Sequence, residues 1–389
     1  MEEWKTYKLG DLATIRGGKR LPKGVALTPV ANSHPYIRIR DLGHSRVLDI
    51  NPIFEYVDDE TQKSISRYIV NTDDVILSIV GTIGLTGIIG KSLNGANLTE
   101  NCVKIVNLNG LESRFLYYFL SSPIGQAEIE RGIVGAVQPK LPIKNIQDIS
   151  IPVPSIEVQK KIADILSSFD QKIELNNRIN HNLEEQAQAL YKSWFIDFEP
   201  FKNGKFVNSD LGLIPKGWRI GKLSDLLEVR YGKDHKSLKD GETPVYGSGG
   251  LMRYAERALY DGESVLIPRK GTLNNVMYVH DAFWTVDTMF YTVERVSNVI
   301  KYCHLFLLTQ DLASMNSGSA VPSMTTDILN NLPLLIPTDD VIKEFNQIVS
   351  ASYEIRKKKE NESSFLSQSR DAILPQLMTG QLKNTFLNC

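Results

Sequence analysis

Two segments of the sequence concentrate lysine and arginine, the side chains that bind phosphate. Residues 1–40 carry eight of them against three acids, and residues 216–239 carry seven against three. The formal net charge of the chain is −1, so this excess is local. Because a charge acts on a nucleic acid within a screening length of about 10 Å, a local excess is enough. Each residue taken alone is more often a solvated surface charge, but the clustering and the recurrence favour phosphate contacts by Arg16, Lys19, Arg20, Lys23, Arg230, Lys233 and Lys236.

Two glycine turns offer a second kind of contact. Gly81-Thr82 and Gly271-Thr272 each follow a short run of apolar residues. Glycine lets a backbone come close to phosphate, although a plain hairpin explains these turns equally well. Beside the second turn lie side chains of the types that read guanine and adenine edges in the major groove of DNA, namely Arg269, Lys270, Asn274 and Asn275.

The surroundings of the two turns differ in charge. Residues 79–83 around the first turn carry no charged side chain, so we expect the two turns to read different DNA sequences. A third pair of polar, glycine-containing loops spans residues 135–140 and 318–323. From these loops we predict contacts by Lys140 and Ser323.

The sequence offers no complete catalytic motif. Residues 51–54, Asn-Pro-Ile-Phe, approach the Asn-Pro-Pro-aromatic motif of amino-methyltransferases but lack the second proline, and Asn-Pro is typical of a turn. Gly17-Gly18-Lys19 lacks the spacing of a phosphate-binding P-loop. The six histidines show no metal-ligand spacing. We therefore expect no catalytic residue, no metal and no cofactor in this chain.

Bulk features narrow the class of protein. No stretch reaches the roughly 18 apolar residues of a membrane span. The first residues lack the basic and apolar regions of a secretory signal. The three cysteines, Cys102, Cys303 and Cys389, are scattered and form no Cys-x-x-Cys pair. We expect a cytoplasmic protein without a membrane segment.

An internal repeat predicts how these residues are positioned. Residues 4–12 align with 218–226 at an offset of 214, residues 75–82 with 265–272 at 190, and residues 135–154 with 318–337 at 183. The offset shrinks because the second copy has shorter loops. The chain therefore contains two similar domains. Each is predicted as mixed α/β, with strands at 75–80, 102–106, 265–267 and 289–293 and single helices at 115–120 and 302–308. The order of strands in the sheets is not predicted.

Each copy is followed by a long amphipathic segment. Apolar residues recur at spacings of three and four from Ile162, and the first helix is predicted from about Glu157 to Trp194. The matched stripes predict an intramolecular antiparallel coiled coil, with Asn176 opposite Lys359 and Glu362. Two amphipathic helices packed on their own domains are the alternative. The predicted domains are residues 1–154, the helix 155–199, residues 200–337 and the helix 338–389.

These elements resemble the specificity subunit of type I restriction–modification systems over nearly the whole chain. The matching stretches are Leu9-Gly-Asp-Leu-Ala, Ile151-Pro-Val-Pro154, Ser193-Trp-Phe-Ile-Asp-Phe-Glu-Pro200, Leu211-Gly-Leu-Ile-Pro-Lys-Gly-Trp218 and Ile373-Leu-Pro-Gln-Leu-Met-Thr-Gly-Gln-Leu382. Five weak motifs in the right order, together with the circular repeat, make a specific combination. One departure is Val158-Gln159, where the family often has Glu-Gln at the start of the first helix; the second copy has Val341-Ile342.

The resemblance implies a fold and a function. Two α+β target-recognition domains, related by a pseudo-twofold axis, each read one half of a split target in double-stranded DNA, and the antiparallel helices between them set the spacing. The helices also dock two modification subunits, which carry S-adenosylmethionine and methylate adenine N6. Restriction subunits, which use ATP and Mg²⁺, complete the complex. The alternatives are a specificity subunit serving a fused methyltransferase–nuclease, and a coiled-coil scaffold that binds proteins.

Overall fold

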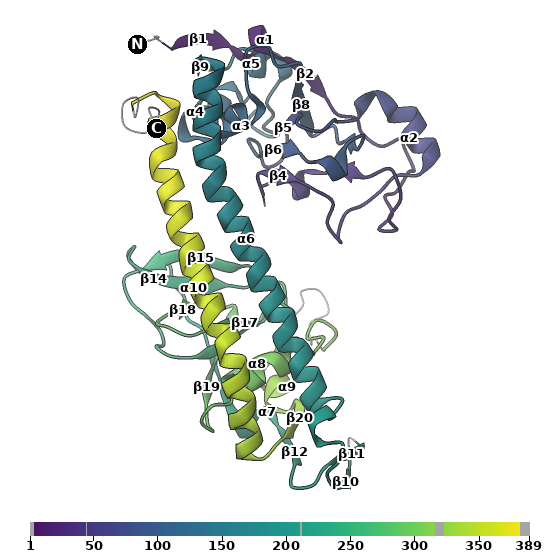
Figure 1. Cartoon of the computed structure of the whole chain (residues 1–389), viewed down its shortest axis with the longest axis vertical. Helices are drawn as coiled ribbons and strands as arrows, with labels where there is room; N and C mark the ends of the chain where they lie inside the picture. Colours follow the sequence, from purple (N-terminus) through teal and green to yellow (C-terminus); the bar gives the residue numbers. More distant parts are fainter. Residues whose placement is uncertain (1–3, 44, 211, 316–322, 382–389) are drawn as a thin grey trace. The chain divides into compact units, whose positions relative to one another are not determined.

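The chain divides into two compact units, each containing one copy of the repeat. The computed structural model describes residues 4–43, 45–210, 212–315 and 323–381. Unit 1 comprises residues 1–177 and 360–389, and unit 2 comprises residues 178–359 (Figure 1). The division passes through both long helices, so each unit contains one part of each helix. The predicted boundaries at residues 154, 199 and 337 follow sequence segments instead and stay a prediction.

Unit 1 is built on a five-stranded sheet. Its strands, in spatial order, are β2 (Thr14–Gly17), β8 (Cys102–Val106), β5 (Val75–Ser78), β6 (Thr86–Ile89) and β4 (Val47–Leu48). Both β2 and β5 run antiparallel to β8, with Gly17 and Leu77 opposite Val103. The two strands therefore end at the same side of the sheet. Two smaller sheets pair β1 (Lys5–Lys8) with β9 (Ser150–Val153) and β3 (Tyr36–Ile37) with β7 (Asn97–Leu98).

Unit 2 repeats this topology. Its main sheet has the order β13 (Leu227–Tyr231), β19 (Met289–Glu294), β16 (Ser264–Pro268) and β17 (Met277–Val279). The smaller sheets pair β12 (Arg219–Lys222) with β20 (Pro333–Ile336) and β14 (Thr243–Gly247) with β18 (Trp284–Thr285). Unit 2 adds β15 (Gly250–Ala255) beside β14, and a hairpin of β10 (Phe206–Ser209) and β11 (Gly212–Pro215). The prediction of two similar mixed α/β domains is confirmed.

The short helices follow the same repeat. Unit 1 contains α1 (Leu9–Leu12), α3 (Ser113–Ser121) and α5 (Ile143–Gln147), and unit 2 contains α7 (Leu223–Leu226), α8 (Ile300–Leu308) and α9 (Thr326–Asn330). Within the described residues, α2 (Asp59–Ile65) and α4 (Pro123–Gly132) belong to unit 1 alone. Short 3-10 turns lie at η1 (Ile39–Asp41), η2 (Ser66–Tyr68), η3 (Lys91–Leu93) and η4 (Glu199–Phe201). The helices predicted at 115–120 and 302–308 correspond to α3 and α8.

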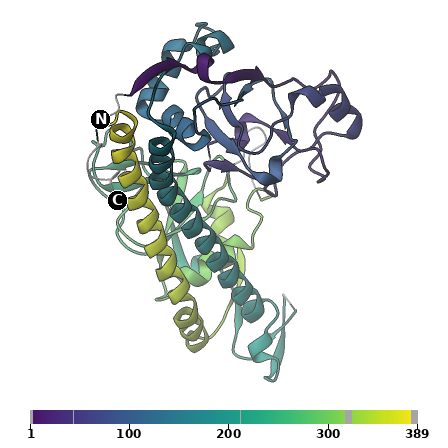
Figure 2. The same ribbon diagram turned by 45° about the horizontal axis from the view of Figure 1, so that its top comes forward.

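The two long helices occupy identical positions in the repeat. α6 (Ile156–Phe195) and α10 (Asp339–Met378) each have 40 residues, and α10 continues through Pro375. Within each unit they run side by side in opposite directions (Figures 1 and 2). In unit 1, Asn176 Nδ2 donates to Glu362 Oε2 at 3.1 Å. The predicted antiparallel pair is therefore confirmed within each unit, including the contact between Asn176 and Glu362.

Each long helix also packs on the sheets of its unit. Ile162 and Leu166 of α6 and Leu374 of α10 belong to the core of unit 1. In unit 2 the core takes Tyr191 from α6 and Phe345 from α10. The alternative expectation, helices packed on their own domains, thus also holds in part. The core of each unit includes side chains from both long helices.

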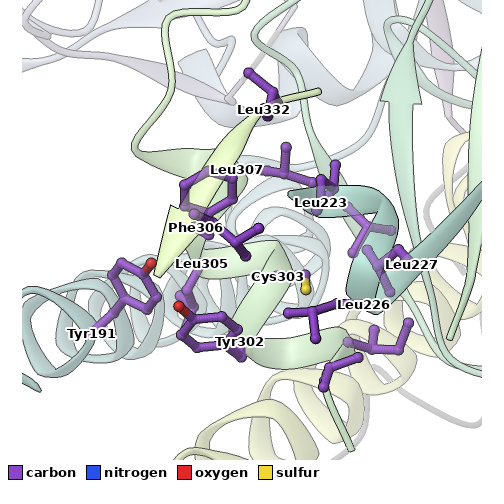
Figure 3. Close-up of a cluster of buried hydrophobic side chains, with 14 of the residues drawn as sticks. Tyr191, Leu223, Leu226, Leu227, Tyr302, Cys303, Leu305, Phe306, Leu307 and Leu332 are labelled. Carbon is purple, nitrogen blue, oxygen red and sulfur yellow. The ribbon is translucent and has the colours of Figure 1, made fainter. Parts of the chain in front are cut away.

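Figure 3 shows part of the core of unit 2, with Tyr191 of α6 and Tyr302 and Cys303 of α8 among its buried side chains. Tyr302 of α8 lies 5.5 Å from Tyr191 of α6, centroid to centroid, and its hydroxyl donates to the Leu335 carbonyl of β20. Cys303 is fully buried beside it, and burial raises the pKa of its thiol. Cys102 is a buried free thiol in unit 1, and Cys389 lies outside the described residues.

Candidate nucleic-acid interface

The first predicted segment is a Gly-Lys pair that follows the first strand of each main sheet. Gly18 N donates to Cys102 O at 3.0 Å, and Gly232 N donates to Met289 O at 3.0 Å. A Cβ on Gly18 would lie 2.0 Å from the Thr99 carbonyl oxygen, and one on Gly232 would lie equally close to that of Val286. Both glycines are therefore required by the crossing of two backbones. The lysines that follow them are exposed.

The second segment is the glycine turn after β5 and after β16. Gly81 has φ +75° and Gly271 has φ +86°, a left-handed conformation that favours glycine. Because β2 and β5 both run antiparallel to β8, the turn at Gly81 lies at the same end of the sheet as Lys19. In unit 2 the strand directions are the same, and the Arg269 guanidinium lies 5.4 Å from the centre of the Tyr231 ring. The first two segments therefore converge in both units.

The third segment joins the second through an isolated β-bridge. Val80 pairs with Lys140 in unit 1, and Lys270 pairs with Ser323 in unit 2. The flanking hydrogen bonds also match, since Leu141 N donates to Ile79 O and Met324 N donates to Arg269 O, both at 2.9 Å. Residues 318–322 of the second predicted loop lie outside the described residues.

The three segments meet at one end of each main sheet. We call this end of the sheet the loop edge. In unit 1 it comprises residues 16–23, 80–82 and 140, and in unit 2 residues 230–236, 269–272 and 323. The sequence predicted these segments separately, and the strand order brings them together.

The basic side chains of the loop edge in unit 1 differ in how available they are. Arg20 Nε lies 2.6 Å from Glu100 Oε1, so a phosphate would compete with this carboxylate. Lys19 Nζ lies 5.6 Å from the centre of the Tyr68 ring, a cation–π contact that leaves the ammonium exposed. Arg16, on β2, and Lys23 are exposed. With Lys140, which is also exposed, four of the five predicted cations at this edge are thus not paired with an acid within the described part of the chain.

The loop edge of unit 2 holds its own set. Arg230 donates to Glu228 Oε2 at 2.8 Å, a hydrogen bond that raises the pKa of Arg230. Lys233, Lys236 and Lys270 are exposed, and the Lys236 backbone N donates to Asp234 Oδ1 at 3.1 Å. Arg230 matches Arg20 in having a carboxylate partner. Lys233, Lys236 and Lys270 are not paired with an acid as far as the described residues extend, and Arg269 contacts the Asp287 carbonyl and the Tyr231 ring without an acid partner.

The two asparagines predicted to read bases hold the loop edge together. Asn274 Nδ2 donates to Asp311 Oδ1 at 3.0 Å, and its Oδ1 accepts from Ala313 N at 2.8 Å. Asn275 Nδ2 donates to the Ser248 carbonyl at 2.7 Å. These bonds occupy part of the hydrogen-bonding capacity of both amides and fix their orientation, which limits how they could turn toward a base. The sequence could not reveal this, because the partners are 26 or more residues away in the chain.

Sequence reasoning missed the hairpin of β14 and β15 as a neighbour of this site. Ser248 at its tip accepts from Asn275, and its Oγ lies 2.6 Å from where a Cβ on Gly271 would be. Leu251 and Met252, on β15, are about half exposed, at 50% and 55%. The run Gly247-Ser248-Gly249-Gly250 was the available signal, since such runs mark tight turns.

Asn51, the first residue of the incomplete motif, and the buried His304 both make contacts that stabilise the fold. Asn51 forms the predicted turn, with Ile53 N donating to its Oδ1 at 3.0 Å and Phe54 N to its carbonyl at 3.1 Å. His304 is buried against the Tyr353 hydroxyl at 2.7 Å, and burial lowers the pKa of His304 to about 3. Among the described residues, no group of three or more His, Cys, Asp or Glu side chains could hold a metal ion.

Over the same residues, no helix combines the length and apolar character of a membrane span.

Comparison with known proteins agrees with this architecture. The model of the type I restriction modification DNA specificity domain matches residues 1–185 and 215–362. The type I restriction enzyme MjaIX specificity subunit of Methanocaldococcus jannaschii is 26% identical over 98% of this chain and 94% of its own length. The HindI specificity subunit of Haemophilus influenzae is 22% identical over 63% of this chain and 71% of its own.

A solved structure shows the same fold. The type I restriction–modification S subunit from M. genitalium superposes with a TM-score of 0.56 at 18% identity, covering 96% of both chains. The family model matches well over half of this sequence, in two blocks that correspond to the two copies of the repeat. The chain therefore belongs to the family of type I restriction modification DNA specificity domains.

Proposed function

We propose that this chain reads DNA sequence for a type I restriction–modification complex, with each loop edge contacting one half of a split target. The observation that carries the proposal is the convergence of three separately predicted segments at one end of the sheet, twice in one chain. Exposed lysines there are suited to phosphate, whose contacts position a protein on DNA, while other side chains and DNA shape supply specificity.

The proposed contacts are those named from the sequence. At the loop edge of unit 1 they are Arg16, Lys19, Arg20, Lys23, Gly81, Thr82 and Lys140. At that of unit 2 they are Arg230, Lys233, Lys236, Arg269, Lys270, Gly271, Thr272 and Ser323, and Asn274 follows two residues after this edge in the chain. For Asn274 we propose that it positions the loop and does not itself contact DNA, because its Nδ2 and Oδ1 bond Asp311 and Ala313.

The helix pair is proposed to set the spacing between the two half-sites. Each helix has 40 residues, about 60 Å at 1.5 Å per residue. Side chains on facing helices fix the register within each unit, through Asn176 and Glu362 in unit 1 and through Glu184 and Arg356 in unit 2. A pair held in register can act as a ruler.

The proposed partners are double-stranded DNA, two modification subunits on the helices, and restriction subunits, all in the cytoplasm. S-adenosylmethionine, ATP and Mg²⁺ belong to those partners in this scheme, and this chain supplies recognition without a catalytic group. The buried, hydrogen-bonded environment of His304 and the turn formed by Asn51 support a non-catalytic role for these two residues.

The test is DNA binding by the chain assembled with its modification subunits. Phosphate neutralisation predicts a linear fall of log affinity with log salt concentration, with a slope near −0.9 per contact. Exchanging residues 1–150 for those of a relative should then change one half of the methylated sequence and leave the other. A flat salt response would point to the protein-binding scaffold, and a change in both halves would refute one reading domain per half-site.

A further inference from the structure

The bridge at the loop edge carries one lysine in each unit, but on opposite strands. In unit 1 the pair is Val80 and Lys140, and in unit 2 the equivalent pair is Lys270 and Ser323. The repeat offsets align Val80 with Lys270 and Lys140 with Ser323. The lysine has therefore changed strands between the two copies while the bridge has stayed in place.

Either strand of this bridge presents its side chain to the same region. Residues paired directly in an antiparallel bridge point to the same face, with Cβ atoms about 5 Å apart. A lysine stem has four flexible carbons, so an ammonium group reaches a common point from either position. The backbone of Lys140 is also bonded to Val134, away from the bridge to Val80. Lys140 N donates to Val134 O at 3.0 Å, and Val134 N donates to Lys140 O at 2.9 Å.

Both lysines are exposed, and neither side chain is paired with an acid within the described part of the chain. Val80 is half-buried and reaches solvent as well. Beside the bridge lie the left-handed glycines Gly81 and Gly271, which expose the turn backbone without a side chain. A cation next to a bare backbone turn suits a DNA phosphate, which carries charge but no sequence information.

We propose that this bridge is a phosphate-contact point of each half-site, at which one ammonium group is required and either strand supplies it. The inference rests on the proposed function and deepens it. It assigns Lys140 and Lys270 the same role, despite their different positions in the repeat. It also states that they set affinity and not the sequence that is read.

An experiment that moves the lysine from one strand of the bridge to the other in unit 1 tests this proposal. Three variants are assembled with the modification subunits: Lys140→Ser, the double variant Val80→Lys/Lys140→Ser, and the control Thr6→Lys/Lys140→Ser. Thr6 is exposed on β1, which comes before the start of β2, whereas the loop edge lies at the end of β2. The control therefore restores the net charge away from the loop edge. Affinity for a fluorescent duplex of mixed sequence is measured across a salt series, and the methylated sequence is mapped for each variant.

Loss of one phosphate contact should weaken binding roughly eightfold at about 0.1 M salt and reduce the salt slope by about 0.9. We expect this loss in Lys140→Ser and in the Thr6 control, and recovery to within about twofold of the wild-type affinity in the Val80 variant. The methylated sequence should be the same in all of them. The reciprocal variant in unit 2, Lys270→Ser/Ser323→Lys, should likewise bind better than Lys270→Ser.

Three results would overturn the proposal: equal weakening of the Val80 variant and the control while both remain folded by circular dichroism, no effect of Lys140→Ser, or a changed methylated sequence. If Val80→Lys disrupts folding, the unit 2 pair decides the outcome by the same comparison. A wild-type complex with no salt-dependent binding would instead refute the proposed function itself. The two failures are therefore distinguishable.

Discussion

Arg370 of α10 donates from Nη1 to Oδ1 of Asp170 on α6 at 2.6 Å, and this ion pair lies inside unit 1. Asp170 Oδ2 accepts from the Tyr118 hydroxyl of α3 at 2.5 Å, and the same oxygen lies 3.8 Å from Arg46 Nε. One buried carboxylate thus connects both long helices to the recognition domain. In unit 2, Arg356 and Glu184 form a second interhelical pair, 14 residues after Asp170 in α6 and 14 residues before Arg370 in α10.

Replacing Asp170 by Asn should destabilise unit 1 by about 3 kcal/mol. The side chains of Asp170 and Arg46 are 7% and 8% exposed, so removal of the carboxylate leaves buried cationic charge without its anion. The measurement is the urea midpoint of the full-length chain. Glu184→Gln is the matched control, because its partner Arg356 lies 3.5 Å away and the two side chains are 29% and 21% exposed. We expect this control to cost about 1 kcal/mol or less, and equal losses would argue against burial as the cause.

The buried imidazole of His304 should make stability depend on pH. Burial lowers the pKa of His304 from 6.5 to about 3, so the folded chain keeps it neutral where the unfolded chain binds a proton. Its contribution is complete above about pH 6.5 and is lost progressively as the pH falls toward 3. Near pH 5.5 the loss should approach about 1.4 kcal/mol.

Comparing His304→Gln with the parent chain isolates this effect. The stability difference between the two proteins should shrink as the pH falls from about 7.5 to about 5.5, as followed by urea unfolding. Asn182→Gln, at an exposed position of α6 in the same unit, is the control and should leave the pH dependence unchanged because it removes no titratable group. A difference for His304→Gln that is constant over this range would show that the imidazole is not kept neutral.

Gly232 should not tolerate a methyl group. Its Cβ would lie 2.0 Å from the Val286 carbonyl oxygen, and backbone cannot yield as a side-chain end can. We expect Gly232→Ala to lower the free energy of unfolding by about 2 to 3 kcal/mol. Gly249→Ala is the matched control, since nothing lies within 4 Å of its Cβ position, and its free energy of unfolding should stay near that of the parent. A tolerated Gly232→Ala would mean that the backbone crossing is looser than described.

Lengthening both helices together should change the spacing of the DNA target. Seven residues inserted after Asn177 and seven after Lys359 preserve the heptad register and add roughly 10 Å, close to three base pairs. We expect a methylation map with the same half-sites and a longer spacer. Insertion into α6 alone is the control, and it should impair folding by shifting one helix against the other. An unchanged spacer in the double insertion would exclude the ruler.

Much of this architecture followed from local sequence. The predicted helix from Glu157 to Trp194 lies within the observed span of Ile156–Phe195, and the predicted strand at 102–106 matches β8. Such elements depend on periodicity and on residues next to each other in the chain, which a sequence displays directly. The repeat offsets likewise located the three segments of each loop edge.

Only the tertiary structure decided what those segments do together. The order β2-β8-β5 places Lys19 and Gly81 at the same end of the sheet, and the bridge from Val80 to Lys140 completes the edge. Tertiary contacts also bond Asn274, which the sequence predicts as a base contact, to the Asp311 side chain, and they place Gly18 where two backbones cross. These outcomes depend on hydrogen bonds between strands far apart in sequence. No spacing or composition encodes such partners, because each strand could pair with several others until the whole sheet is assembled.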